Sequence, residues 1–275
     1  MNRFATSALA VALASLATAA AFAQAPTTHD MASMPGMEGM HDMPAPSVPA
    51  AVAKAVADPG RAEDAKIDAR RHVAELVAFS EAKPGDRVLE LIPGSGYFTR
   101  VFSKVVGPKG TVYAELPAEM EKGHPGADRM RALGKQGYGN IEILIQPAAA
   151  LRVPKPVDVA FTSQNYHDYP DTFMGPTDPA LLDKAVFAAL KPGGTYIVID
   201  HAAETGSGLR DTDTLHRIDP AFVRKQVTDA GFEYVGESEV LRNPADDHTL
   251  KVFDPAIRGH TDQFAYKFRK PKSAK

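Results

Sequence analysis

The sequence predicts an α/β fold: a Rossmann-like, doubly wound sheet that is mostly parallel, with an antiparallel C-terminal strand and helices on both faces. Three observations lead to this prediction. Short apolar runs alternate with helical segments through residues 87–230, which is typical of strands joined by crossover helices. A glycine-rich turn follows the first of these runs. The last two apolar runs have no helical segment between them, which predicts an antiparallel addition at one edge.

The first 23 residues have the pattern of a secretory signal peptide. Arg3 precedes an alanine-rich apolar run that ends in Ala21-Phe22-Ala23, a small-x-small cleavage pattern. An uncleaved membrane anchor is the alternative, and the weak hydrophobicity of the run disfavours it. We therefore expect cleavage after Ala23 and an exported protein, periplasmic if the source is a Gram-negative bacterium.

The composition of residues 24–57, rich in methionine, histidine and proline, predicts a disordered linker. Its stretch "HDMASMPGMEGMHDM" carries a methionine at every third position. Thioether sulfurs and imidazoles suit Cu(I), so this tail is a candidate copper site. A low-complexity spacer is the alternative. The candidate metal ligands are His29, Met31, Met34, Met37, Met40, His41 and Met43.

The predicted domain covers residues 58–275 and begins with a helix. Asp58 suits an N-cap and Pro59 the first helical position, and the Lys-Pro-Gly at 83–85 is expected to end this helix. Asp178 and Asp219, each followed by proline, predict two later N-caps. We expect strands at 87–92, 111–116, 141–146, 157–164 and 195–200, helices at 97–106, 127–134, 180–190 and 221–230, and two closing strands at 232–242 and 263–270.

Composition narrows the class of protein. The 275 residues include no cysteine, so an exported chain of this sequence must be held together by its core alone. The net charge of −3 gives no basic footprint for nucleic acid. No stretch after the signal peptide reaches the roughly 18 apolar residues of a membrane span. We expect a small-molecule substrate, no nucleic-acid partner and no membrane span; the oligomeric state stays unknown.

The turn "ELIPGSGYFT" (90–99) joins the first strand to a helix. Gly94 and Gly96 allow a ligand to approach the backbone closely, and the helix N-terminus offers free N–H groups. Glu115 ends the next strand, where a carboxylate can accept hydrogen bonds from ribose hydroxyls. An ordinary tight turn and a solvated strand end are the alternatives. A dinucleotide site would need a third glycine at Thr99, so a nucleoside cofactor other than NAD is favoured.

Together with these residues, the segments "SQNYHDYPD", "ALKPGGTYIVIDH" and "DTLHRIDPAFVRKQVTDAGFE" make the chain resemble class I S-adenosylmethionine-dependent methyltransferases over residues 58–270. More narrowly, it resembles a group of exported bacterial predicted methyltransferases. The resemblance implies S-adenosylmethionine as the cofactor. It implies that Glu90 orients the amino acid end of this cofactor, that Glu115 binds the ribose and that Asn165 faces the methionine moiety or the substrate. The implied cradle is Gly94, Ser95 and Gly96.

Two positions depart from the pattern of these methyltransferases. Ile92 stands where a glycine is usual. Pro147 stands where an aspartate usually contacts the adenine amino group, and a proline offers neither a carboxylate nor an N–H. Adenine recognition is therefore expected to differ in this chain.

Two histidines are the candidate catalytic residues. His167 follows the fourth strand and His201 follows the fifth. Histidine suits a general base because it titrates near neutral pH, although a loop histidine bonded to backbone is the alternative for both. Asp168 is a weak candidate for orienting His167. Arg71 could bind a carboxylate, but a solvated helix face is the favoured interpretation.

Three functions compete on this evidence. The first and preferred one is a methyltransferase that acts on a small-molecule or envelope acceptor. The second is a non-catalytic protein that binds a nucleoside or metabolite on the same fold. The third is a periplasmic copper-handling protein whose Met/His tail is the working part.

Overall fold

The computed structural model describes residues 47–121, 125–174 and 177–272. The chain divides into two units, residues 1–39 and residues 40–275, and the first lies wholly outside these ranges. The signal peptide and the Met/His tail, from His29 to Met43, also lie outside the described residues. Cleavage after Ala23, export and copper binding therefore stay predictions.

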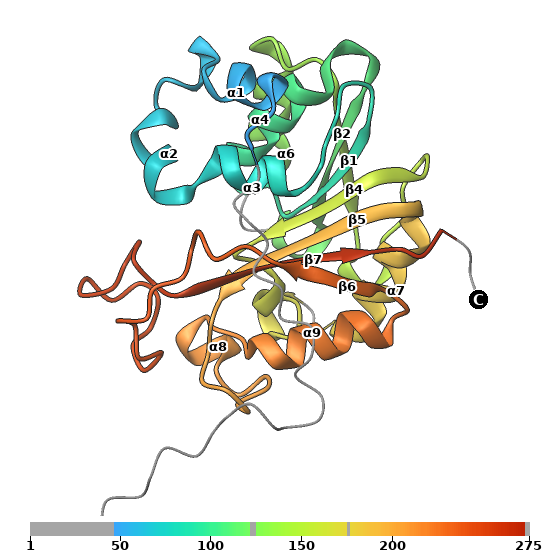
Figure 1. The fold of residues 1–275 in the computed structure, drawn as a ribbon. Helices are drawn as coiled ribbons and strands as arrows, with labels where there is room; N and C mark the ends of the chain where they lie inside the picture. The colour runs from blue at the N-terminus through green and yellow to red at the C-terminus, as the bar shows by residue number, and fades with distance from the viewer. Residues whose placement is uncertain (1–46, 122–124, 175–176, 273–275) are drawn as a thin grey trace, which may run out of the picture. The chain divides into compact units, whose positions relative to one another are not determined.

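The described residues form a seven-stranded sheet with the order β3-β2-β1-β4-β5-β7-β6 (Figure 1). Strands β1 to β5 pair in parallel, and β7 lies antiparallel between β5 and β6. This arrangement confirms the predicted doubly wound sheet and its antiparallel C-terminal strand. The strands are β1 (Arg87–Leu91), β2 (Thr111–Pro117), β3 (Ile141–Gln146), β4 (Val157–Ser163), β5 (Leu190–His201), β6 (Glu233–Glu237) and β7 (Gln263–Arg269).

Helices cover both faces of the sheet, as predicted (Figure 1). Helices α1, α3 and α4 bury apolar side chains against one face of the central strands, and α6 extends this layer over β2 and β3. Helices α7 and α9 cover the other face. The α-helices are α1 (Ala50–Val56), α2 (Ala65–Arg71), α3 (Val73–Phe79), α4 (Tyr97–Val106), α5 (Ala118–Glu121), α6 (Gly126–Lys135), α7 (Pro179–Ala189), α8 (Thr212–Leu215) and α9 (Pro220–Asp229).

The three predicted Asp-Pro caps are confirmed. Asp58 accepts a hydrogen bond from the Gly60 N–H before a short 3₁₀ turn. Asp178 and Asp219 accept hydrogen bonds from the second helical N–H of α7 and α9. In each case a carboxylate oxygen satisfies a donor that a helix end leaves unpaired.

The N-terminal part of the domain differs from the prediction in two respects. Helix α1 lies inside the stretch 24–57 that the sequence predicts as a linker, and its Val52 and Ala55 are buried, so the packed chain begins before residue 58. The single helix predicted from Asp58 is instead two helices, α2 and α3. His72 breaks it with a left-handed conformation, φ 46°, which a histidine adopts only where its surroundings require it.

The fifth strand begins earlier than expected. The sequence predicts that Lys191-Pro192-Gly193-Gly194 is only the loop that ends a helix, but β5 already starts at Leu190. The irregular pairing between Val157 and Val159 of β4 absorbs the extra residues. The turn-like residues 191–194 thus lie within the strand as an irregularity, and regular pairing resumes at Thr195.

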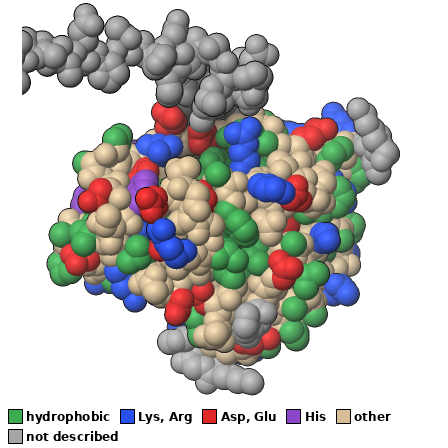
Figure 2. Space-filling model, turned by 90° about the horizontal axis from the view of Figure 1, so that it is seen from below, with side chains coloured by type: hydrophobic (Ala, Val, Ile, Leu, Met, Phe, Trp, Pro, Cys, Tyr) green, Lys and Arg blue, Asp and Glu red, His purple; other side chains and the backbone are tan. Residues whose placement is uncertain are grey.

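The surface seen from the side of α8 and α9 carries charges of both signs. Figure 2 shows Lys and Arg side chains interspersed with Asp, Glu and apolar ones, and histidine side chains that reach the surface at one side. Within the described ranges, no helix is long and apolar enough to span a lipid bilayer.

Candidate functional site

A cavity of about 190 Å³ lies at the carboxyl ends of β1 and β4, where the strand order reverses and α/β sheets place their ligands. The turn after β1 forms one wall, the residues after β4 form the second, and the C-terminus of α2 contributes Arg71. The predicted site residues that line this cavity are Glu90, Gly94, Ser95 and Asn165.

Glu90 is a buried carboxylate with an unsatisfied oxygen. Its side chain is only 3% exposed, and its Oε2 has no hydrogen-bond partner among the described residues. Burial raises the pKa of Glu90 to about 8, although hydrogen bonding from Thr99 and the charge of Arg71 oppose the rise. A ligand that brought a cationic N–H donor into the cavity would relieve this unfavourable burial.

Arg71 is not on a solvated helix face, so the favoured interpretation of this residue is corrected. It is half-buried, and its Nη2 donates a hydrogen bond of 3.2 Å to Ser163 Oγ. Its guanidinium lies 4.7 Å from the centre of the Tyr97 ring. The break at His72 ends α2 directly after Arg71, which lets this side chain face the cavity instead of continuing around a longer helix.

Glu115 lies at the carboxyl end of β2, paired with Leu91 of β1. It is 1% exposed, and neither of its oxygens has a partner within the part of the chain that the structure describes. Burial raises the pKa of Glu115 to about 8, and the charge of Glu119 adds to the rise, whereas Tyr169 lowers it. Two buried carboxylates with incompletely satisfied oxygens thus flank the turn after β1, which fits a ligand rich in O–H and N–H donors.

The two glycines of the turn have different roles. Gly94 has φ 58°, and a Cβ added there would meet nothing within 4 Å, so its backbone is open to a ligand in the cavity. A Cβ on Gly96 would instead lie 2.4 Å from Leu133 Cδ1. Gly96, predicted as part of the cradle, therefore serves close packing of α6 against the turn. Ser95 is exposed at the cavity wall.

Both departures from the methyltransferase pattern lie at this edge of the sheet. Ile92 adopts a left-handed conformation with φ 49°, which a glycine would adopt without strain, and its buried side chain belongs to the core around β1 and β2. Pro147 directly follows β3 and precedes a 3₁₀ turn.

The Asn165 side-chain amide donates to the carbonyl groups of Ile92 and Ser163, so it ties the two walls of the cavity together.

His167 is held by a carboxylate that the sequence did not single out. Its Nδ1 lies 2.8 Å from Asp200 Oδ1, and its backbone N–H donates to Asp200 Oδ2. Its Nε2 lies 3.2 Å from Asp168 Oδ1. Burial alone would lower the pKa of His167, but the charge of Asp200 and the hydrogen bonds with Asp168 and Asp200 outweigh it and raise this pKa to about 10.

His201 occupies a different environment although its ring centre lies 6.2 Å from that of His167. Its Nδ1 is 2.7 Å from Thr261 Oγ1. Burial lowers the pKa of His201 to about 4, against the opposing charge of Asp200. The two candidate catalytic residues thus lie together at the ends of β4 and β5, and a base role for either stays a prediction. The sequence analysis did not predict that Asp200 bonds His167. The position of Asp200 at the end of the apolar run 195–200 was the feature of the sequence that could have indicated it.

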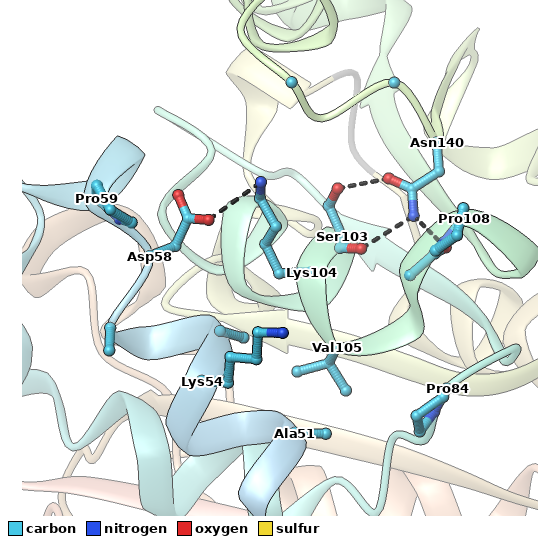
Figure 3. Close-up of a pocket in the computed structure, with 15 residues that line it drawn as sticks. Ala51, Lys54, Asp58, Pro59, Pro84, Ser103, Lys104, Val105, Pro108 and Asn140 are labelled. Atoms are coloured by element: carbon cyan, nitrogen blue, oxygen red, sulfur yellow. Dashed lines mark hydrogen bonds and ion pairs between the residues drawn. The ribbon is translucent and has the colours of Figure 1, made fainter.

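A larger cavity, about 900 Å³, lies at the opposite edge of the sheet (Figure 3). Its wall includes α1 and the loops that precede β1, β2 and β3. Four of the polar side chains in it are paired with one another: Lys104 lies 3.0 Å from Asp58, and Asn140 bonds with Ser103. Since ligand sites of such sheets lie at the carboxyl ends of the strands, the smaller cavity is the functional candidate.

Comparison with known proteins shows which families this chain is similar to. The family model of protein-L-isoaspartate(D-aspartate) O-methyltransferase matches residues 54–136. The ubiquinone/menaquinone biosynthesis C-methyltransferase UbiE of Vibrio cholerae serotype O1 is 32% identical over 181 residues, which are 62% of this chain. The chain covers 63% of the length of that relative.

Solved structures share the fold at low sequence identity. A methyltransferase from Aquifex aeolicus that depends on S-adenosylmethionine has a TM-score of 0.50 and 20% identity, covering 79% of this chain and 97% of its own. The [4+2]-cyclase SpnF has a TM-score of 0.57 and 16% identity, covering 84% and 99%. The resemblance to class I S-adenosylmethionine-dependent methyltransferases is confirmed. The cyclase shows that proteins of this fold also carry other activities.

Proposed function

We propose that this chain is a methyltransferase that takes the methyl group from S-adenosylmethionine and transfers it to a small-molecule acceptor. One observation carries the proposal: a buried carboxylate with a free oxygen, Glu90, and a half-buried guanidinium, Arg71, line the same cavity at the ends of β1 and β4. An α-amino acid group carries one charge of each sign, and these two side chains match them. Glu115, with two unpaired oxygens, would accept the ribose hydroxyls.

The bound cofactor would supply an electrophilic methyl group, and the chain's own residues would position the reactants. Arg71 and Glu90 would hold the amino acid end, and Gly94 leaves the backbone open beside it. Asn165, which joins the two walls of the cavity, would keep the walls at a fixed spacing. The acceptor would enter beyond Asn165, on the side of His167.

The acceptor class is open, and the relatives suggest where to begin. Proteins named ubiquinone/menaquinone biosynthesis C-methyltransferase are 28–32% identical to this chain over 181 to 183 aligned residues. We propose quinone-type aromatic compounds as the first acceptors to assay. Activity would be followed as transfer of radiolabelled methyl groups, with envelope extracts as a second acceptor source.

Calorimetry with S-adenosylmethionine on the full chain tests the cofactor assignment. Arg71→Gln and Glu90→Gln each remove one charged contact, and we expect each to weaken binding about 10- to 100-fold. Arg70→Gln is the matched control, because Arg70 precedes Arg71 on α2 but is exposed. No binding by the wild type, or equal binding by the Arg70 and Arg71 variants, would remove the basis of the proposal.

A binding protein without transfer activity is the second candidate. The cavity of about 190 Å³ is smaller than the roughly 300–1,000 Å³ of common ligand pockets, and Ile92 and Pro147 depart from the methyltransferase pattern. Binding that is tight, depends on Arg71 and yields no methyl transfer to any acceptor would favour this candidate over the first.

Export and copper binding remain part of the proposal. They rest on the sequence of residues 1–23 and on the Met/His tail. Deletion of residues 29–43 should abolish Cu(I) binding while S-adenosylmethionine binding persists. If Cu(I) affinity survives the deletion, the tail is not the copper site.

A further inference from the structure

A second group of polar side chains gathers at the ends of β4 and β5, beyond the cavity. His167 Nε2 lies 3.3 Å from His216 Nδ1 and 3.2 Å from Asp168 Oδ1. His216 Nδ1 lies 3.8 Å from the same Asp168 oxygen. We propose that His167, Asp168 and His216 bind a divalent first-row transition-metal ion.

The separations of the three ligand atoms fit a single ion. Two ligand atoms that each lie about 2.1 Å from an ion are about 3.0 Å apart in octahedral and about 3.4 Å apart in tetrahedral coordination. Two of the three observed distances fall in this range, and the third exceeds it by less than half an ångström. Two imidazoles and one carboxylate are a ligand set that zinc and iron sites use.

A hydrogen-bond network without an ion satisfies these groups less well. The single N–H that Nε2 of His167 can carry faces two atoms, at 3.3 and 3.2 Å. It can point at only one of them, whereas an ion between the three atoms would contact all of them. Binding of an ion would displace the Nε2 proton that Asp168 otherwise accepts and would join all three ligand atoms, including the His216 nitrogen.

Asp200 orients His167 in the way that a carboxylate behind a metal-ligating histidine does. It is fully buried, and it bonds both the Nδ1 and the backbone N–H of His167. With Nδ1 bound to a carboxylate, Nε2 is the ring nitrogen left to face the other ligands. Ligating histidines are commonly held by a carboxylate on the nitrogen that does not touch the metal.

His216 is also fixed in place. It caps α8 in a left-handed conformation, φ 53°. Helix α8 is tied to the segment after the 3₁₀ turn of His167, because Thr212 Oγ1 donates a hydrogen bond of 2.7 Å to Asp171, whose backbone N–H donates to the carbonyl of Asp168. The His216 side chain is 22% exposed, against 4% for His167. The site thus opens to solvent on the His216 side, which provides a path for an ion.

The protein offers three ligands, so an ion would keep open coordination positions. Phe253, 54% exposed, lies beside them with its ring centre 5.0 Å from that of His216. If the proposed methyl transfer holds, on which only this step rests, the open positions would bind an acceptor oxygen while Phe253 contacts its apolar part. The metal site itself does not depend on that activity.

The test measures Zn²⁺ binding by equilibrium dialysis on the full chain after chelator treatment, with the absorption of bound Co²⁺ as a report on its ligands. Every protein carries His29→Ala and His41→Ala, so that tail histidines do not contribute. We expect one tightly bound ion. His216→Ala and Asp168→Asn should each weaken its binding at least about 100-fold and alter the Co²⁺ spectrum.

His248→Ala is the matched control, because His248 also faces a carboxylate, Asp262, at 3.0 Å but belongs to no group of three converging ligand atoms among the described residues. It should bind Zn²⁺ like the wild type. Circular dichroism checks that the variants fold, and two ligand variants are used so that one unfolded protein does not decide the result. No bound ion, or equal affinity in the wild type and both ligand variants, would overturn the proposal.

Calorimetry with S-adenosylmethionine on the same proteins separates the two proposals. Loss of metal with intact cofactor binding in His216→Ala would support the metal site independently of the cofactor site. A wild type that binds the cofactor but no Zn²⁺ would leave the methyltransferase proposal standing and refute the metal site.

Discussion

Buried carboxylates at the carboxyl edge of the sheet are hydrogen-bonded to different extents beside β1 and β2 and beside β4 and β5. On the side of β1 and β2, Glu90 and Glu115 have oxygens with no partner among the described residues. On the side of β4 and β5, Asp200 is equally buried but bonds His167 twice and the backbone of His201. A buried carboxylate without partners raises the free energy of the folded chain, whereas a fully bonded one does not.

This difference indicates different roles. Unpaired carboxylates are tolerated where a ligand completes their hydrogen bonds, and perturbed pKa values of this kind concentrate at functional sites. Paired ones hold neighbouring groups in fixed positions. The first side is thus suited to binding a ligand, and the second to holding His167 in one orientation.

The largest expected effect is on stability when the paired side is broken. Asp200→Ala leaves His167 buried beside an empty carboxylate position, and we expect a loss of about 3–5 kcal/mol in the free energy of unfolding. Glu90→Gln replaces a buried carboxyl whose raised pKa of about 8 keeps it mostly neutral at pH 7, so it should change stability far less at neutral pH. Urea denaturation of both variants measures the contrast, and equal losses would show that the two sides do not differ.

The buried carboxyls Glu90 and Glu115 should contribute to the pH dependence of stability. Burial raises the pKa values of Glu90 and Glu115 to about 8, above their value in the unfolded chain. Their contribution is fully present below about pH 4.5 and is lost as pH rises through 8. Each group should lower the free energy of unfolding by up to about 1.4 kcal/mol per pH unit in this interval.

Replacement by amide separates these contributions. Glu115→Gln should remove one such slope from urea denaturation measured between pH 5 and 8. Asp183→Asn is the control, because burial raises the pKa of Asp183 to about 8 as well, but this residue bonds Tyr166 away from the cavity. Both variants should flatten the profile, and only Glu115→Gln should impair S-adenosylmethionine binding. A profile unchanged by either would show that these carboxyls are already ionised.

How far the sequence predicts this edge depends on the kind of signal. Glu90 and Glu115 were predicted because they stand in motifs that resemble those of methyltransferases. The helix caps were predicted because aspartate favours the N-cap and proline the first helical position; they are Asp58, Asp178 and Asp219. All three caps are confirmed. Such signals are local, so the sequence contains them in full.

Contacts between distant segments were not predictable in the same way. The position of Arg71 depends on the left-handed conformation of His72, which ends α2. Neither glycine nor proline stands at this position, so the sequence does not predict that the helix ends there. The bond between His167, in the turn after β4, and Asp200, on β5, joins residues 33 positions apart. Both features follow from how strands and helices pack, which no single stretch of sequence specifies.

A methyl group at Gly94 should affect the ligand-binding side by a smaller amount. Gly94→Ala places a Cβ on a residue with φ 58°, which should cost about 1–2 kcal/mol of stability and obstruct the cavity. Gly85→Ala is the control, because Gly85 also has a positive φ and open space around the added Cβ but does not line this cavity. Similar losses of stability with a loss of S-adenosylmethionine binding only in Gly94→Ala would support the assignment; equal binding would contradict it.

The smallest expected effect concerns the residue that joins the two sides. Asn165 donates to the Ile92 carbonyl at 3.1 Å and to the Ser163 carbonyl at 2.7 Å, so Asn165→Ala should cost about 0.5–1.5 kcal/mol. Asn165 bonds neither Glu90 nor His167 directly. Its loss should therefore loosen the walls of the cavity while the hydrogen bonds of Glu90 and of His167 stay in place. We expect S-adenosylmethionine binding to weaken a few-fold while Zn²⁺ binding is unchanged. If both ligands weaken together, the two sides are one coupled site and the contrast between them does not hold.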